Sequence, residues 1–292
     1  MPINQSINQS INQSINQSIN QSINSSLTFA VITATIGRPE LERAIISVQN
    51  QTYPCKHYVF VDGKKFWDKV KPLEAKYPDV EFIYLPMNTG GNGMGCLRIL
   101  AAAPFLINED IICLLDDDNW YDENHIEGFI PFFEKHNVDY AYHLRHLYDD
   151  DGQFICDDNY DSLGFWKIEL PTYKAITRNH DFLVDTNCYA IQKNLLLQIS
   201  YSWIKNDRGL FRKLISISNI TGCCTALRTV NYCAHLSIYD PKIGKLTLLP
   251  MQLTREISLF WEDYAQKHSK LEWLVPTLFR EGQLIPIEKH SE

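Results

Sequence analysis

Short apolar runs alternate with segments of helical periodicity through the first half of the chain. The runs that we expect to form strands cover residues 28–34, 57–61, 80–85 and 111–115. Between them, apolar residues recur at helical spacing, as in the segment that follows Pro39. This β-α-β-α-β-α-β order predicts an α/β fold with a mostly parallel central sheet. Helices should cover both faces, and ligands should bind at the carboxyl ends of the strands.

Three consecutive aspartates, Asp116, Asp117 and Asp118, directly follow the last of these apolar runs. Neighbouring carboxylates repel each other, so the arrangement indicates a cation or ligand that supplies compensating charge. Carboxylate oxygens suit Mn²⁺ or Mg²⁺ and leave coordination positions for substrate phosphates. Strand alternation predicts that Asp116 and Asp118 face one side and Asp117 the other. The alternative is a solvated acidic loop in which Asp122 caps the next helix.

A glycine-rich segment, residues 88–95, follows the third expected strand and precedes a small-residue helix over 97–106. Its glycine spacing differs from that of a dinucleotide-binding fingerprint, and it lacks the Gly-Lys-Ser/Thr of a Walker loop. We expect a mobile loop whose backbone can approach a ligand closely.

The second half of the chain shows weaker patterns. Asp122 is expected to begin a helix that buries Ile126, Phe129, Ile130 and Phe133. A strand is expected over 138–144, and Asp151-Gly152 is typical of a turn between two hairpin strands.

Composition excludes several classes of protein. The formal net charge is −8, and no cluster of basic residues interleaved with aromatics is present, so we expect no nucleic-acid partner. The eight cysteines form no C-x-x-C pair, which predicts free thiols in a reducing compartment. No apolar stretch approaches the roughly 20 residues needed to span a bilayer. We expect a cytoplasmic protein, with peripheral contact to the inner face of the cytoplasmic membrane as an option.

The chain divides into three segments by pattern. An I-N-Q-S repeat occupies residues 3–24 and has no core-forming cluster, so we expect a disordered tail over 1–26. The repeat resembles translated tetranucleotide tracts, which switch some bacterial surface-glycan genes on and off. The expected folded domain covers 27–250, and a C-terminal helical extension, with an apolar segment at 271–279, covers 251–292.

Four motifs together resemble the GT-A fold, family-2-type glycosyltransferases. They are the segments 31–53, 59–63, 88–93 with the nearby Arg98, and 114–119. The resemblance is strongest over residues 27–138, which it implies are the nucleotide-binding half, with an acceptor half over 139–250. One departure is that the family usually has two acids where this chain has only Asp62 before Gly63.

The resemblance implies roles for individual residues. Asp118 matches the metal-binding acid of the D-x-D motif, and His235 is a candidate further metal ligand. The implied nucleotide-sugar-binding residues are Thr35, Arg38, Asp62, Arg98, Asp116 and Asp117.

The catalytic base is expected to be Asp207, at the start of a helix, with Asp185 as the second choice. A helix N-cap role for Asp207, and a structural role for His235 in a strand, are the competing interpretations.

The resemblance implies a metal-dependent glycosyltransferase, inverting in this interpretation, with Mn²⁺ or Mg²⁺ as cofactor. It would move a sugar from a nucleotide-diphosphate donor to a hydroxyl of a glycan or lipid-linked acceptor, in bacterial surface polysaccharide or lipooligosaccharide synthesis. A nucleotidyltransferase would share the sheet and the metal, although the segment after the first strand lacks the lysine that such enzymes use. A non-catalytic carbohydrate-binding protein would keep the aromatics without needing the carboxylates.

Overall fold

The computed structural model describes eight stretches of the chain: residues 27–91, 95–149, 151–158, 184–200, 207–233, 237–240, 245–248 and 275–287. The predicted disorder of residues 1–26, and most of the extension predicted from residue 251, lie outside these stretches.

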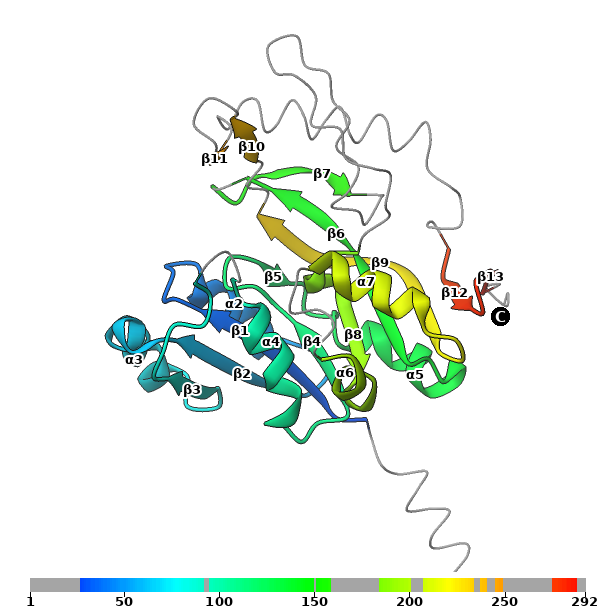
Figure 1. The fold of residues 1–292 in the computed structure, drawn as a ribbon, viewed down its shortest axis with the longest axis horizontal. Helices are drawn as coiled ribbons and strands as arrows, with labels where there is room; N and C mark the ends of the chain where they lie inside the picture. The colour runs from blue at the N-terminus through cyan, green and yellow to red at the C-terminus, as the bar shows by residue number, and fades with distance from the viewer. Residues whose placement is uncertain are drawn as a thin grey trace, which may run out of the picture.

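Four parallel strands form the first half of the central sheet, in the order β3-β2-β1-β4 (Figure 1). Their bounds are β1 (Phe29–Thr35), β2 (Cys55–Asp62), β3 (Glu81–Leu85) and β4 (Ile111–Leu114). Each lies within two residues of an apolar run in the sequence. The connecting helices are α2 (Leu41–Gln49), α3 (Trp67–Lys76) and α4 (Leu97–Ala102). The expected β-α-β-α-β-α-β order is confirmed.

The sheet continues from β4 into strands of the second half. Next to β4 lies β8, which is antiparallel to both of its neighbours, β4 and β6, while β9 runs parallel to β6. Their bounds are β6 (Tyr140–Tyr148), β8 (Tyr189–Gln192) and β9 (Thr221–Cys233). The predicted hairpin at Asp151-Gly152 is confirmed, because β7 (Phe154–Asp158) pairs antiparallel with β6.

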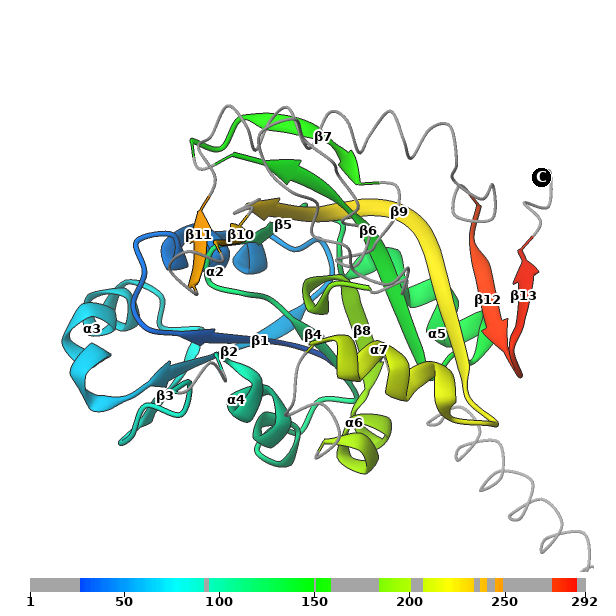
Figure 2. The same ribbon diagram turned by 45° about the horizontal axis from the view of Figure 1, so that its top comes forward.

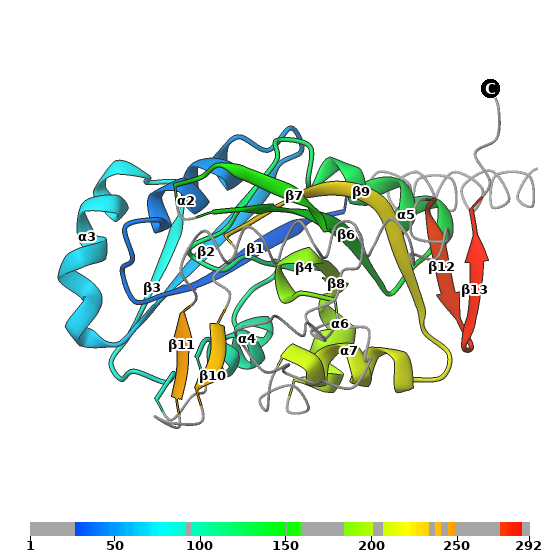
Figure 3. The same ribbon diagram turned by 90° about the horizontal axis from the view of Figure 1, so that it is seen from above.

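Helices cover both faces of this sheet, as Figures 2 and 3 show. One face carries α2 and α5 (Ile130–His136); the other carries α4, α6 (Lys193–Ile199) and α7 (Asp207–Ser216). The apolar residues that recur at helical spacing after Pro39 are all buried on α2: Leu41, Ala44, Ile45 and Val48. Burial of such side chains, at about 1.5–3 kcal/mol each, stabilises helix against sheet.

The helix that we expected to begin at Asp122 begins later. Residues Trp120–Tyr121 instead form a short strand, β5, which pairs with β9. The α-helix starts at Ile130, after a single 3₁₀ turn at Glu127–Phe129. Asp122 is not its N-cap, because its Oδ1 accepts a hydrogen bond from Asn231 Nδ2 at 2.7 Å. A strand of only two residues has no detectable periodicity in the sequence. The sequence pattern therefore predicts a helix that begins several residues too early.

The C-terminal helical extension predicted over 251–292 is wrong for residues 275–287, the part of it that the structure describes. β12 (Thr277–Arg280) pairs antiparallel with β9, and β13 (Gln283–Pro286) pairs with β12, so this end of the chain adds a hairpin to the sheet edge. A separate two-stranded ribbon is made by β10 (Ser237–Asp240) and β11 (Lys245–Leu248).

The expected lack of disulfides is confirmed for the seven cysteines whose state the structure gives, while the compartment stays a prediction. None of them forms a disulfide, and five of them are buried: Cys113, Cys188, Cys223, Cys224 and Cys233. No helix among the described residues is long and apolar enough to cross a membrane.

Candidate functional site

The carboxyl ends of β1 and β4 meet at one edge of the sheet, where polar side chains from both strands join. Thr35, the last residue of β1, donates a hydrogen bond from Oγ1 to Asp117 Oδ2 at 2.6 Å, and its Oγ1 also accepts from the backbone N–H of Gly37 at 2.9 Å. Arg38, in the β1–α2 loop, reaches the same place through its contacts with Asp117 and Asp118. Thr35, Arg38 and the aspartates therefore lie together at the carboxyl ends of these two strands.

Arg38 supplies positive charge to two of the three aspartates. Its Nε lies 3.6 Å from Asp117 Oδ1, and its Nη1 donates to Asp118 Oδ2. The Arg38 side chain is 46% exposed, whereas those of Asp117 and Asp118 are 8% and 17% exposed. A half-exposed guanidinium can move to a phosphate without the cost of breaking a buried ion pair.

The strand geometry on which the predicted alternation of the three aspartates rests is absent, because β4 ends before them. Asp117 and Asp118 share Arg38, while Asp116 turns toward Asn187. The reason is that β4 ends at Leu114 and the chain then turns, with the N–H of Asn119 donating to the carbonyl of Asp116 at 3.2 Å. Strand periodicity does not apply within a turn.

Asp116 has partners that the other two aspartates do not share. Asn187 Nδ2 donates to Asp116 Oδ2 at 2.9 Å, and the Cys96 thiol contacts Oδ1 at 3.8 Å. Burial raises the pKa of Asp116 to about 7, with the charges of Asp185 and Asp118 adding to the effect and the Asn187 hydrogen bond opposing it. Its carboxylate is therefore poorly compensated by the protein.

Burial also raises the pKa of Asp117, to about 6, although its hydrogen bond from Thr35 and the charge of Arg38 act in the other direction. Two neighbouring carboxyls with raised pKa values are typical of a site that a cation or a ligand completes.

Asp62, at the end of β2, is fully engaged with the following glycine-rich loop. Its Oδ1 accepts from the N–H of Thr89 at 2.7 Å, and its Oδ2 accepts from the N–H of Gly90 and from Asn88 Nδ2, each at 3.0 Å. Arg98 donates from Nη1 to the carbonyl of Thr89. Asp62 and Arg98 thus contact the loop 88–90, and among the described contacts neither bonds to the three aspartates.

Asp185 forms a buried ion pair. Its Oδ2 accepts from Arg145 Nη1 at 2.7 Å, and both side chains are 4% exposed. Its Oδ1 accepts from the N–H and the Nδ2 of Asn187, at 2.8 and 2.7 Å. Both oxygens of this candidate base are therefore occupied.

The remaining predicted site residues are Asp207 and His235. Asp207 is the first residue of α7, as predicted, but the position of its carboxylate lies outside what the structure describes. His235 lies outside the described residues, two positions after the end of β9.

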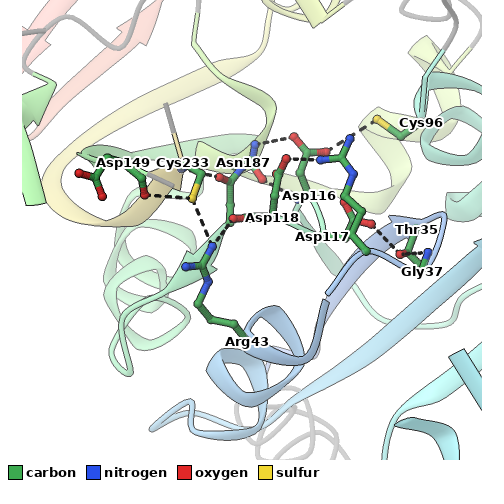
Figure 4. A network of polar contacts seen from close by, with 12 residues as sticks. Thr35, Gly37, Arg43, Cys96, Asp116, Asp117, Asp118, Asp149, Asn187 and Cys233 are labelled. Carbon is green, nitrogen blue, oxygen red and sulfur yellow. Dashed lines mark hydrogen bonds and ion pairs between the residues drawn. The ribbon is translucent and has the colours of Figure 1, made fainter. Parts of the chain in front are cut away.

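Arg43, which the sequence did not single out, supports the acidic turn from α2. Its Nη2 donates to the carbonyl of Asp118 at 2.6 Å and contacts Cys233 Sγ at 3.2 Å (Figure 4). Its guanidinium lies 3.9 Å from the centre of the Trp120 ring. The N–H of Cys233 in turn donates to Asn119 Oδ1 at 2.9 Å. The end of β9 is thereby joined to the turn after β4.

These residues fit a divalent cation by charge and by donor chemistry. Three carboxylates are gathered in one turn, and the guanidinium that pairs with their oxygens, that of Arg38, carries a single positive charge. Their oxygens are the ligand type that Mn²⁺ and Mg²⁺ prefer. Within the described stretches, however, no three His, Cys, Asp or Glu side chains already surround one position. Water or a substrate phosphate would have to complete the coordination.

The sequence as a whole matches a known family. The profile of glycosyl transferase family 2 matches residues 30–232, which include the whole acidic turn and most of the central sheet. The chain belongs to glycosyl transferase family 2. Its fold is accordingly the GT-A fold, as the sequence motifs implied. No curated protein sequence matches the chain.

Solved structures with this fold include TarS of S. aureus. The structure of TarS 1–349 in complex with UDP-GlcNAc is 13% identical, with a TM-score of 0.53, and the match covers 85% of this chain and 78% of that one. TarS 1–349 without a named ligand is 14% identical, with a TM-score of 0.52, and the match covers 71% of this chain. In that comparison the present chain spans 60% of the length of the TarS chain.

Proposed function

We propose that this family 2 glycosyltransferase transfers a sugar from a nucleotide-diphosphate donor to a hydroxyl of a glycan or lipid-linked acceptor. The observation that carries the proposal is the turn after β4, where three consecutive aspartates, two of them with raised pKa values, meet the half-exposed Arg38. The related fold of TarS has been solved with UDP and with UDP-GlcNAc, which supports a donor of this class.

The proposed cofactor is Mn²⁺ or Mg²⁺, held by Asp118. Such a cation would stabilise the negative charge that develops on the leaving diphosphate. Asp116 would contact the ribose, and Thr35, Asp62 and Arg98 would form the base side. Asp117 and Arg38 would lie against the diphosphate, with Arg38 free to move from the carboxylates to the phosphates because it is half-exposed. His235 stays a candidate further ligand.

The proposed general base is Asp207, which would remove the acceptor proton in a single inverting displacement. Asp185 is the less suitable alternative because both of its oxygens already accept hydrogen bonds and one faces Arg145.

The proposed pathway is bacterial surface polysaccharide or lipooligosaccharide synthesis. It rests on the family and on the I-N-Q-S repeat, whose period of four resembles tetranucleotide tracts in genes of that kind. An enzyme with a lipid-linked acceptor would work at the inner face of the cytoplasmic membrane.

Calorimetry with UDP, GDP and CMP, each with and without Mn²⁺, tests the proposal. We expect one nucleoside diphosphate to bind, and to bind more tightly with the metal. A panel of nucleotide sugars, assayed for hydrolysis without acceptor, would then identify the donor. A nucleotidyltransferase would instead bind nucleoside triphosphates and release pyrophosphate. The absence of any nucleotide binding would leave a carbohydrate-binding protein as the surviving interpretation.

A further inference from the structure

Asn187 joins the two halves of the domain at the acidic turn. Its Oδ1 accepts from the N–H of Asp116 at 2.6 Å, and its Nδ2 donates to Asp116 Oδ2 at 2.9 Å (Figure 4). The residue lies in the 3₁₀ turn Thr186–Cys188 that precedes β8, and it is 1% exposed. One amide side chain therefore contacts both the backbone and the carboxylate of Asp116, which limits how that carboxylate can rotate.

Asp185 determines the orientation of this amide. The N–H of Asn187 donates to Asp185 Oδ1 at 2.8 Å, and the same oxygen accepts from Asn187 Nδ2 at 2.7 Å. An amide has donors on one atom and its acceptor on the other, so contact with two carboxylates forces Nδ2 toward them and Oδ1 toward the N–H of Asp116.

Arg145 in turn holds Asp185. Its Nη1 lies 2.7 Å from Asp185 Oδ2, and its guanidinium lies 4.4 Å from the centre of the Tyr232 ring on β9. A buried pair of this kind adds little net stability, because desolvation costs offset the attraction, but losing one partner leaves an uncompensated charge. A role in fixing geometry is a better account of its presence than a role in stability.

We propose that Asn187 is the positioning residue for Asp116, and that the Arg145–Asp185 pair positions Asn187. These contacts run from Arg145 through Asp185 and Asn187 to Asp116. They would fix the orientation in which the Asp116 carboxylate binds the nucleotide of the donor. This inference rests on the proposed function, and it assigns Asp185 a positioning role rather than that of base. Asn187 is specific for the task, since an aspartate there would face two carboxylates and lack both donors.

The test measures, by calorimetry with Mn²⁺, the dissociation constant of whichever nucleoside diphosphate the wild-type protein binds. The variants are Asn187→Ala and its matched control Gln192→Ala. Gln192 ends β8, the strand after the Asn187 turn, and its amide donates a hydrogen bond to the carbonyl of Val138 at 2.9 Å. Asn187→Ala should weaken nucleotide binding by about 10- to 100-fold, the range for one hydrogen bond to a charged group. Gln192→Ala should leave nucleotide binding within about twofold of wild type, because the hydrogen bond that is lost joins two neutral groups and does not involve the acidic turn.

A double-mutant cycle separates positioning from general destabilisation. If Asn187 acts through Asp116, adding Asn187→Ala to Asp116→Asn should weaken binding little beyond the single Asp116→Asn change. Full additivity would overturn the inference, and so would equal effects of Asn187→Ala and Gln192→Ala. No nucleotide binding by the wild type would instead overturn the proposed function together with this inference.

The ion pair is tested with Arg145→Gln, Asp185→Asn and their combination. Each single change should weaken nucleotide binding, because it breaks the ion pair that holds Asp185 in place beside Asn187. The double variant, which carries neither charge but can still form hydrogen bonds, should bind more tightly than Asp185→Asn alone. Wild-type affinity in the folded Asp185→Asn protein would show that Asp185 takes no part in positioning Asn187.

Discussion

The three aspartates of the turn after β4 differ in what their side chains contact. Asp116 bonds to Asn187, and Asp117 bonds to Thr35 and faces Arg38. Asp118 pairs with Arg38 alone among the described side chains, and its carbonyl is held by Arg43. Asp118 is also the more exposed of the two that share Arg38, so of these two its carboxylate is the more available to a cation.

Asp118→Ala should therefore abolish metal-dependent nucleotide binding and turnover together. Asp117→Asn should reduce binding by less than about tenfold, because its amide oxygen can still accept from Thr35 and a neutral side chain suits a site that already raises the pKa of this carboxyl. Calorimetry with and without Mn²⁺ measures both. Equal losses in the two variants would show that Asp117, too, holds the metal.

The proposed base allows a second prediction at this scale. Asp207→Asn preserves the shape of the residue and its preference for a helix start, so folding and donor binding should survive. Turnover should fall by about 10²- to 10⁴-fold, the usual contribution of general-base catalysis. Calorimetry and a donor–acceptor assay on the same preparation separate the two effects. Near-full turnover would remove Asp207 from the base role and return Asp185 to consideration.

At the scale of elements, the segment 88–91 is anchored to the sheet by the end of β2. Asp62 accepts from two loop N–H groups and a side-chain amide, and it is 4% exposed. The loop also packs too closely for a side chain at one position. A Cβ on Gly90 would lie 2.7 Å from the carbonyl oxygen of Gly95, whereas one on Gly91 would meet no atom within 4 Å.

Gly90→Ala and Gly91→Ala form a matched pair for testing this anchor. Gly90→Ala should push the loop off Asp62 and destabilise the protein by about 1–3 kcal/mol, the range for overpacking a well-packed position. Gly91→Ala should be neutral or slightly stabilising, because it only restricts the unfolded chain. Urea denaturation measures both changes. If Asp62 and its loop form the base side of the donor site, Gly90→Ala should also weaken nucleotide binding.

The elements that sequence reasoning recovered are those with a local signal. Central strands such as Ile111–Leu114 are apolar throughout because both of their faces are covered, and α2 shows one buried stripe. The missed elements depend on partners. The strand Trp120–Tyr121 has two residues and exists by pairing with β9, and Thr277–Arg280 is a strand because it too lies beside β9. Apolar content with no clear period could not distinguish that hairpin from a helix.

At the scale of the molecule, the candidate site is shared between halves that are distant in sequence. The acids of the turn could be found from the chain, because charges after an apolar strand are a local pattern. Their supports could not. Arg43 contacts Cys233, 190 positions away, and Asn187 contacts Asp116, 71 positions away. Only the packing of β8 and β9 beside β4 and β6 brings these residues together.

Three histidines of the described stretches are buried inside the domain. His57 contacts Thr33 Oγ1 at 2.9 Å through Nε2, and His125 and His143 bond to Thr229 and Thr225 of β9. Burial lowers the pKa of His57 and of His143 to about 3, and it lowers that of His125 as well. The folded protein therefore holds these imidazoles in the neutral form.

This burial predicts how stability responds to acid. Between pH 6.5, the ordinary histidine pKa, and pH 3 the unfolded chain binds a proton on His57 that the folded chain does not, so its contribution to stability is lost as the pH falls. At pH 5.0, about 1.5 units below the ordinary value, the loss is about 2 kcal/mol. Asp116 and Asp117 act in the opposite direction, because their raised pKa values let the folded state take up protons first.

His57→Gln isolates the histidine contribution from that of the acids. Gln can still bond to Thr33 but does not titrate, so the stability lost between pH 7.5 and 5.0 should be smaller than in wild type by about 2 kcal/mol. Urea denaturation at the two pH values measures it, with His136→Gln, at a partly exposed residue in the last turn of α5, as the control. The control should keep the wild-type pH dependence. If His57→Gln keeps it as well, His57 is protonated in the folded state and the neutral, buried assignment is wrong.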